Sequence, residues 1–249
     1  MTSILSSAFN WAVSQVFPGN CWNRMVVEAD VMDKKCFPIV MSRLLGFAIT
    51  FGSAFLFVPQ ILKIHNAKSG RGISLISQLL ALLSAGVVCA YSYEKKFVFS
   101  QWGDSLAVFI QITMIVMQIL YFDPKLTSYT FAFMAFIWML SMSVTYHYIP
   151  FHIIQALQTG VIPLIVVSKG IQIVTNFQNK STGQLALVSV CLQLGGTVAR
   201  VFTSIQETGD NLVIASFAVA AVLNGIIFLQ MLIYWNSDAK KTAKAKKRN

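Results

Sequence analysis

The chain has 249 residues, of which 56% are hydrophobic and only 11% are charged. This number of polar residues is too small to cover the surface of a water-soluble fold. The composition therefore excludes a soluble globular protein and predicts a polytopic membrane protein. The formal net charge of +10 does not indicate a nucleic-acid partner, because basic residues beside membrane spans ordinarily set orientation or contact anionic lipids.

Seven apolar runs of roughly 20 residues follow one another, and each is long enough to cross a bilayer as a helix. They cover 41–62, 73–93, 104–122, 126–146, 153–174, 184–206 and 211–235. We therefore expect an all-α fold with seven transmembrane helices and with the two termini on opposite sides of the membrane.

Basic residues lie mostly on one side of these spans. The segments on the side of the C-terminus include the basic tail and contain, as acids, only Asp123 and Asp238. The segments on the opposite side carry acids and bases in nearly equal number. Because basic loops stay in the cytosol, we expect a cytosolic C-terminus and a lumenal N-terminus.

The tail places Lys246 and Lys247 at the fourth and third positions from its end. This pattern resembles the dilysine signal that returns membrane proteins to the endoplasmic reticulum, and the expected topology puts it on the required cytosolic face. A tail this basic can also place two lysines there by chance. The first alternative predicts a resident of the endoplasmic reticulum membrane.

Two cysteines, Cys21 and Cys36, precede the first span on the expected lumenal side. Oxidation is allowed in that compartment, and closing a loop of this length would stabilise the segment. The residues themselves leave open whether the two form a disulfide.

Part of the sequence is repeated. Lys68-Ser69 and the apolar run after it return 112 residues later at Lys180-Ser181, and a Gly-Asp pair at 103–104 returns 106 residues later at 209–210. Matching order at a nearly constant offset predicts two copies of one helical unit, as membrane transport proteins often have. With seven spans, the copies take three helices each, run parallel, and leave the fourth span as a connector.

Five segments follow from this arrangement. They are a lumenal N-terminal segment (1–38), a first three-helix repeat (39–122), a connector helix (123–150), a second three-helix repeat (151–236) and a basic cytosolic tail (237–249).

Arg200 stands almost alone as a charge deep within a predicted span. Intramembrane charges are costly and are usually functional. Its guanidinium could bind an anionic head group or a phosphate through two hydrogen bonds, or be neutralised by helix carbonyls or a neighbouring carboxylate, or act in gating. Glu207 and Asp210 lie nearer the lumenal surface. They could be partners of Arg200, form a second polar patch, or belong to a solvated loop.

Amide side chains form a second candidate set. Gln111 and Gln118 lie two helical turns apart on nearly the same face of the third predicted span, and the offset of 106 places Asn224 opposite Gln118. These amides could bind sugar hydroxyls at an axis between the copies, or hydrogen-bond between helices.

Proline and glycine mark positions where helices can bend. Pro59 removes one backbone hydrogen bond in the first span, and Gly195-Gly196 in the sixth span allows close packing or a bend. The offset of 112 matches Pro59-Gln60 with Ile171-Gln172, so the second copy keeps the glutamine and lacks the proline.

Enzymatic patterns are absent from the sequence. The three histidines have no metal-ligand spacing, and there is no phosphate-binding glycine loop, nucleophile elbow or carboxylate pair within a span. We predict no catalytic residue, no metal and no cofactor.

Pro59-Gln60, the loop at Lys68-Ser69 and the degenerate copy at Ile171-Gln172 resemble the PQ-loop family of seven-span membrane proteins. The stretch Ala199–Asp210 is similar to the branch of that family concerned with lipid-linked sugars. Proton-coupled members of the family carry an acidic residue near the second Pro-Gln motif, and this chain has none beside Ile171-Gln172, so proton coupling is not expected.

The resemblance implies an endoplasmic reticulum protein needed for the use of dolichol-phosphate-linked mannose and glucose in N-glycan precursor, GPI-anchor and mannosylation pathways. Two mechanisms fit this expectation: movement of the lipid-linked sugar between leaflets, with membrane lipids around the protein, or its presentation to lumenal dolichol-dependent glycosyltransferases. Transport of a free sugar or an amino acid is a third class.

Overall fold

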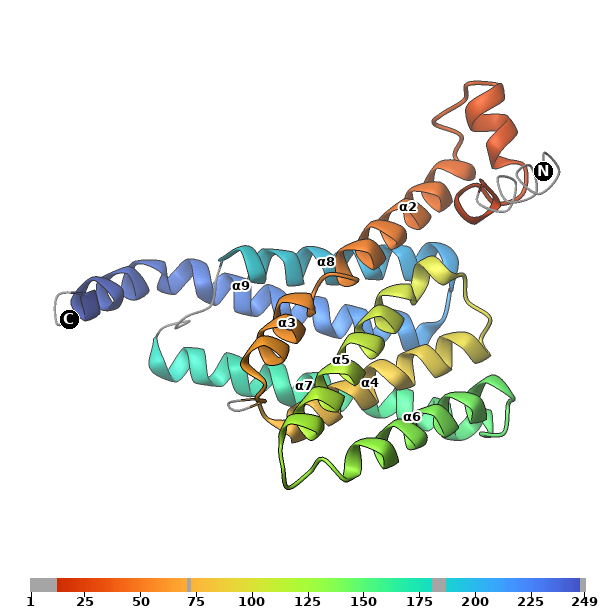
Figure 1. Cartoon of the computed structure of the whole chain (residues 1–249). Helices are drawn as coiled ribbons and strands as arrows, with labels where there is room; N and C mark the ends of the chain where they lie inside the picture. The colour runs from red at the N-terminus through yellow and green to blue at the C-terminus, as the bar shows by residue number, and fades with distance from the viewer. Residues whose placement is uncertain (1–12, 71–72, 181–186, 247–249) are drawn as a thin grey trace. The chain divides into compact units, whose positions relative to one another are not determined.

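The structure is a computed structural model that describes residues 13–70, 73–180 and 187–246; at 187–189 and 235–246 it describes the backbone alone. Every element in these ranges is a helix, so the all-α fold class is confirmed for the described part of the chain (Figure 1). In chain order the helices are η1 (Asn23–Val27), α2 (Cys36–Ser53), α3 (Val58–Ala67), α4 (Leu75–Glu94), η2 (Phe99–Gln101), α5 (Gly103–Phe122), α6 (Tyr129–Thr145), α7 (Phe151–Asn179), α8 (Leu187–Glu207) and α9 (Asn211–Lys246).

Among the residues that the structure describes, five segments are long and apolar enough to cross a membrane, by length and composition. They are Cys36–Ala67, Leu75–Glu94, Gly103–Phe122, Phe151–Asn179 and Asn211–Tyr234. The shorter helix α6 is also apolar, and α8 occupies the predicted sixth span from Leu187 onward. The chain is therefore a multi-pass membrane protein, while the count of seven spans stays a prediction.

The predicted first span is not one continuous helix. The chain leaves the helix after Ser53, at the end of α2, and enters α3 at Val58, with Pro59 in the first turn of α3. Proline fits there because the first N–H groups of a helix have no partner within the helix. The single helix predicted over 41–62 is thus corrected to two helices, which Figure 1 shows in sequence as α2 and α3.

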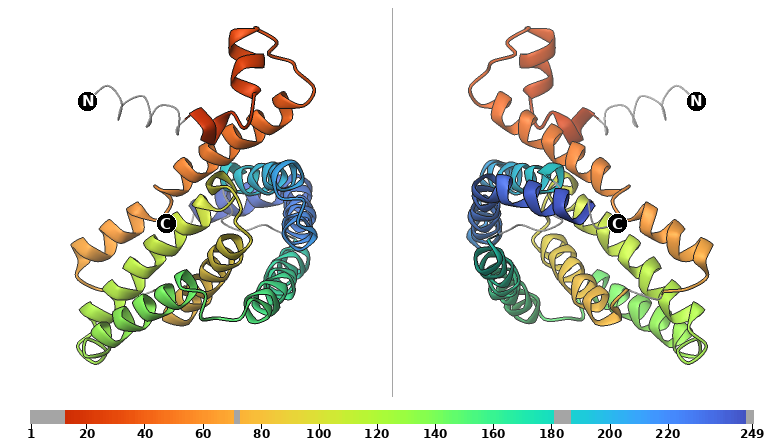
Figure 2. Two further views of the ribbon diagram at one scale, coloured as in Figure 1. Left: turned by 90° about the vertical axis from the view of Figure 1, so that its right-hand side faces the viewer. Right: turned by 90° about the vertical axis from the view of Figure 1, so that its left-hand side faces the viewer.

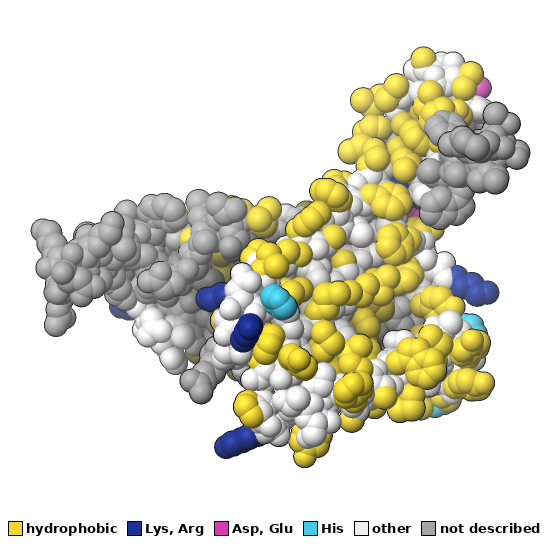
Figure 3. Space-filling model, viewed as in Figure 1, with side chains coloured by type: hydrophobic (Ala, Val, Ile, Leu, Met, Phe, Trp, Pro, Cys, Tyr) yellow, Lys and Arg dark blue, Asp and Glu magenta, His cyan; other side chains and the backbone are white. Residues whose placement is uncertain are grey.

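Many large hydrophobic side chains are exposed, as a lipid-facing surface requires. Phe131 is 88% exposed and Trp138 is 63% exposed, both on α6. Figure 3 shows hydrophobic side chains over much of the described surface on its face of the molecule.

Contacts divide the chain into two compact units. The first ends at Gln158 and also includes Gln206–Thr208, whereas the second consists of Thr159–Ile205 and the chain from Gly209 onward. In the first unit α5 lies beside α4, as Figures 1 and 2 agree, and a core forms around Leu82, Ile112, Val116 and Leu120.

The two copies share their loop geometry at an offset of 112. Lys68, after α3, and Lys180, after α7, both adopt a left-handed backbone with φ of 46°. The N–H of Lys68 donates to the carbonyl of His65, and the N–H of Lys180 donates to that of Phe177. Lys68 and Lys180 therefore have the same backbone geometry at the end of their helices, and Ser181 lies outside the described residues.

Packing extends the same offset into the third helix of each copy. Ile61 lies against Ile115 and Ile119 in the first copy, and the residues 112 positions later, Ile173, Ile227 and Met231, lie together in the second. Where the first copy has η2, the second begins α9 directly. The offset of 106 therefore does not give equivalent positions.

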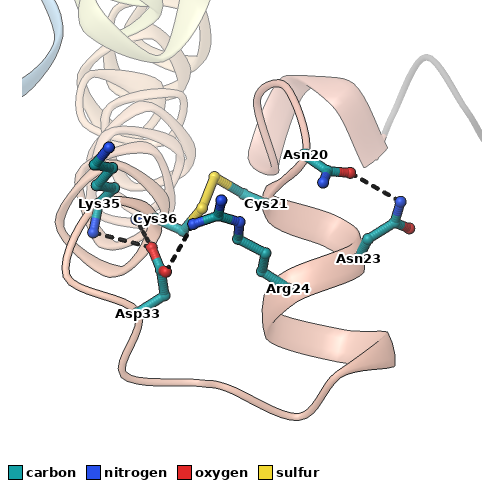
Figure 4. Close-up of a disulfide and its surroundings, with 7 residues drawn as sticks. All are labelled: Asn20, Cys21, Asn23, Arg24, Asp33, Lys35 and Cys36. Carbon is teal, nitrogen blue, oxygen red and sulfur yellow. Dashed lines mark hydrogen bonds and ion pairs between the residues drawn. A yellow bond between two sulfur atoms is a disulfide. The ribbon is translucent and has the colours of Figure 1, made fainter.

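A disulfide joins the segment before α2 to the helix itself (Figure 4). Cys21 bonds to Cys36, the first residue of α2. The Asp33 carboxylate accepts hydrogen bonds from the backbone N–H groups of Cys36 at 2.8 Å and Lys35 at 3.0 Å, and pairs with Arg24 at 3.1 Å. The N–H of Cys36, followed by that of Lys35 and the Arg24 guanidinium, keeps the pKa of Asp33 below its usual value.

Candidate functional site

Polar side chains from three helices of the second unit contact one another, although Gln193 is exposed and Lys169 is half-buried. The Lys169 Nζ on α7 donates to Gln193 Oε1 on α8 at 2.7 Å. Asn224 Nδ2 on α9 lies 3.4 Å from both the carbonyl oxygen of Gln193 and Thr197 Oγ1. An ammonium, two amides and a hydroxyl are therefore joined across α7, α8 and α9, within otherwise apolar helices.

Arg200 extends this group along α8. Gln193, Thr197 and Arg200 are spaced at i, i+4 and i+7, which places them on one face of the helix. Arg200 is only 3% exposed, and the hydroxyl of Thr203 donates to its carbonyl oxygen at 3.2 Å. We call Lys169, Gln193, Thr197, Arg200 and Asn224 the polar cluster.

Charge and geometry indicate what the polar cluster could bind. A guanidinium presents paired N–H donors to a phosphate or carboxylate, whereas an ammonium acts as a compact charge. Lys169 and Arg200 lie within apolar helices, where charge interactions are stronger than in water. The cluster therefore suits an anionic group that carries further hydrogen-bonding atoms.

A separate amide pair lies deeper in the second unit. Asn176 Nδ2 on α7 donates to Gln230 Oε1 on α9 at 3.2 Å, and Gln230 Nε2 donates to the carbonyl of Ile173 at 2.9 Å. Both side chains are buried. This pair holds α7 against α9 as interhelical hydrogen bonds do in membranes.

Gln111 serves the fold of the first unit. Its Oε1 accepts the N–H of Phe57 at 2.8 Å, and its Nε2 donates to the carbonyls of Ser53 at 2.8 Å and Ala107 at 3.0 Å. The side chain thus bridges the break between α2 and α3. The structure matches the interhelical alternative for this amide.

Gln118 differs in its hydrogen bonding from the equivalent residue of the second copy. The offset of 112 pairs it with Gln230 and pairs Ile64 with Asn176, so the donor that Gln230 uses is replaced by an apolar side chain. Accordingly, the buried Oε1 of Gln118 has no hydrogen-bond partner among the described residues. By the offset of 112, the residue equivalent to Gln118 is therefore Gln230 and not Asn224.

Two predicted acidic residues have structural partners. Glu207 Oε1 lies 2.9 Å from Arg43 Nε, and Arg43 Nη1 also donates to the carbonyls of Ser14 and Gln15. Asp210 Oδ1 accepts the N–H groups of Leu212 and Val213 in the first turn of α9. Glu207 is therefore not in a solvated loop, and Asp210 caps a helix.

The remaining predicted residues are placed as follows. Gln60 lies in the first turns of α3, Gln172 within α7, and Ser69 just beyond α3. Gly195 and Gly196 lie within α8, where an added Cβ would meet no atom of the described residues within 4 Å. Lys246 ends α9 in backbone only, and Lys247 lies outside the described residues.

The sequence analysis missed Lys169, Gln193 and Thr197 as site residues. Lys169 lies in the interior of α7, and Gln193 and Thr197 share a face of α8 with Arg200. The sequence offered two signals for them, a lysine inside an apolar run and the i, i+4, i+7 spacing on α8. The contact between residues of three helices could be found only in the structure.

Comparison with known proteins identifies a repeated unit in the chain. The family model for the PQ loop repeat matches residues 41–101 and again residues 153–213. The two matches begin and end 112 residues apart, in agreement with the offset seen in the loops and in the packing. No solved structure matches the chain.

Proposed function

This chain carries two PQ-loop repeats, a unit of a family that includes membrane transporters and exchangers, and on that premise we propose that it moves dolichol-phosphate-linked mannose or glucose between the leaflets of the endoplasmic reticulum membrane. The observation that carries the proposal is Arg200, buried in α8 about two helical turns after Gln193, which accepts a hydrogen bond from Lys169.

The head group of such a lipid must cross an apolar region with a negative phosphodiester and several hydroxyls. Arg200 and Lys169 offset the phosphate charge in the hydrocarbon region, where an unpaired charge is expensive. Asn224 and Gln193 provide amide groups for sugar hydroxyls. In this proposal Gln111 does not contact substrate, because it bridges the α2–α3 break.

The choice of lipid rests on a narrower resemblance. The stretch Ala199–Asp210, which includes Arg200 and Glu207, is similar to the mannose-P-dolichol utilization defect protein. We place the N-terminus in the lumen and the tail with Lys246 and Lys247 in the cytosol, in accordance with the distribution of basic loops.

Leaflet exchange of a short-chain dolichol-phosphate-mannose analogue tests the proposal in liposomes that contain the purified protein. We expect the wild-type protein to accelerate exchange and Arg200→Gln to slow it by about 10- to 100-fold, the equivalent of a charged hydrogen bond of about 1.5–3 kcal/mol. Arg24→Gln removes the same charge outside the membrane helices and should leave exchange unchanged.

Two outcomes would contradict this mechanism. If Arg200→Gln exchanges lipid as fast as the wild-type protein while keeping its melting temperature, the phosphate role is wrong. If the wild-type protein binds the lipid but does not change exchange, transport is wrong, and presentation of the lipid-linked sugar to lumenal transferases becomes the better explanation.

A further inference from the structure

A half-open pocket of about 520 Å³, called the cavity below, lies in the first unit among α4, α5, α6 and the first turns of α7. Its lining is almost entirely aliphatic and aromatic, and includes Leu83, Phe109, Phe133 and Phe136. Water requires two to four polar partners in a buried site, so this lining does not favour water. The cavity therefore suits a hydrocarbon group.

The length of the cavity limits the kinds of ligand that fit it. On α4 the lining runs from Leu79 to Tyr93, which is about 20 Å along the axis of a helix that rises 1.5 Å per residue. A lining of this length can accommodate an extended hydrocarbon chain lying along α4.

Polar and aromatic groups gather at one end of the cavity. Tyr93 and Trp102 line it there, and Lys95 Nζ, just beyond α4, lies 5.7 Å from the centre of the Tyr91 ring. His147 Nδ1 lies 2.8 Å from Glu94 Oε1 at the same end of α4. Amphipathic rings and charges of this kind are typical of the membrane–water boundary, so a chain in the cavity would have its polar end here.

We propose that this cavity binds the isoprenoid chain of a polyprenyl phosphate, with the phosphate at the end marked by Tyr93 and Lys95. The choice of an isoprenoid over an acyl chain rests on the proposed function, since a polyprenyl chain is the part of that substrate that stays within the hydrocarbon region. This site lies in the first unit and is separate from the polar cluster, so the lipid would occupy it at a different step from the one in which Arg200 binds the phosphate.

Two tryptophans allow a direct test. Trp102 lines the cavity, whereas Trp138 is exposed on α6 and does not line it. Single-tryptophan variants of the full chain, with the other tryptophans changed to Phe, are placed in vesicles of brominated phosphatidylcholine, which quenches both. Added dolichyl phosphate should restore Trp102 fluorescence saturably and leave Trp138 quenched.

Matched substitutions on α4 connect this signal to the cavity. Ala90 lines the cavity, and Ala81 is exposed and does not. Ala90→Phe should weaken the protection of Trp102 by dolichyl phosphate at least 10-fold, and Ala81→Phe should leave it unchanged. A melting temperature equal to that of the parent protein shows that Ala90→Phe is folded.

Several results would overturn the proposal. These are equal recovery of Trp102 and Trp138, no recovery of either, protection that is unchanged in Ala90→Phe, or equal protection by phosphatidic acid, whose chains are acyl. Leaflet exchange is measured separately. Protection of Trp102 without exchange would refute the proposed transport and support this site, whereas exchange without protection would refute the site alone.

Discussion

The first helix of each repeat takes a different course at equivalent positions. In the first repeat the chain breaks between Ser53 and Val58, Pro59 opens α3, and Gln111 bridges the gap with three hydrogen bonds. In the second repeat Ile171 stands where the first has Pro59, and α7 is continuous over Phe151–Asn179. The second repeat therefore lacks the proline, and it also lacks the bridging amide, since Leu223 takes the place of Gln111.

Polar groups are divided between the repeats in the same unequal way. The first repeat uses its amide at the helix break and contributes α4 and α5 to the lining of the apolar pocket. The second repeat joins Lys169, Gln193 and Asn224 by hydrogen bonds and carries Arg200 further along α8. Two copies of one unit thus differ in the polar groups that they carry. A common ancestor of the two need not have had either site.

A proline at position 171 would impose the break of the first repeat on the second. Ile171→Pro removes the N–H donated within α7 and brings the ring against the carbonyl four residues earlier, so it should destabilise the protein by about 3 kcal/mol. Ile171→Ala is the control, and the reverse change, Pro59→Ile, should cost less because Pro59 lies in the first turn of α3. Thermal unfolding in detergent, followed by circular dichroism, measures all three.

A second substitution tests whether the amide is the missing component. Adding Leu223→Gln to Ile171→Pro should recover part of the lost stability, because it places an amide at the position equivalent to Gln111. Leu223→Gln alone should destabilise the protein, since a lone amide in an apolar contact is unfavourable. If the double variant is no more stable than Ile171→Pro, the comparison of the two breaks is wrong.

The disulfide before α2 has no counterpart before α7. Cys21 and Cys36 close a loop with a sequence separation of 15, for which the entropy of the unfolded chain gives about 3 kcal/mol. Changing both cysteines to Ser should lower the melting temperature, and reducing agent should have the same effect on the wild-type protein. Changing the free cysteines Cys89 and Cys191 to Ser is the matched control and should leave it nearly unchanged.

Gln111 and Gln118 provide a paired test on a single helix. Gln111→Leu leaves the N–H of Phe57 and the carbonyl of Ser53 without their partner, so it should cost about 1–3 kcal/mol. Gln118→Leu should be neutral or stabilising, because the Oε1 of Gln118 is buried and has no hydrogen-bond partner in the described part of the chain. Equal losses of thermal stability for the two variants would contradict the role of Gln111 at the break.

Composition and repetition in the sequence predicted the helical membrane fold and the repeat at an offset of 112. From the sequence, Pro59 predicted only the loss of one backbone hydrogen bond. The extent of the break could not be predicted, because it depends on Gln111, which is far away in sequence. The offset of 106 was misleading because Gly-Asp pairs favour helix starts wherever they occur, and α9 starts earlier in its copy than α5. The Lys169–Gln193 contact could not be predicted, since it depends on how α7 packs against α8.

The smallest expected effect concerns Asp33, which fixes the start of α2 in the first repeat alone. Its pKa is lowered chiefly by the N–H of Cys36, then by that of Lys35 and by Arg24. A carboxylate with a lowered folded-state pKa contributes stability above its unfolded pKa of about 4, and this contribution is lost as pH falls through the folded value.

The difference in melting temperature between wild type and Asp33→Asn should therefore be constant near neutral pH and shrink below about pH 4. Carbon-13 NMR titration of the Asp33 carboxyl in micelles gives the pKa directly. Arg24→Gln should raise that pKa only slightly, because the backbone N–H of Cys36 remains the main cause and is held in place by the start of α2. A return of the pKa to its usual value in Arg24→Gln would assign the effect to the ion pair, and the start of α2 would then be fixed by the disulfide without help from Asp33.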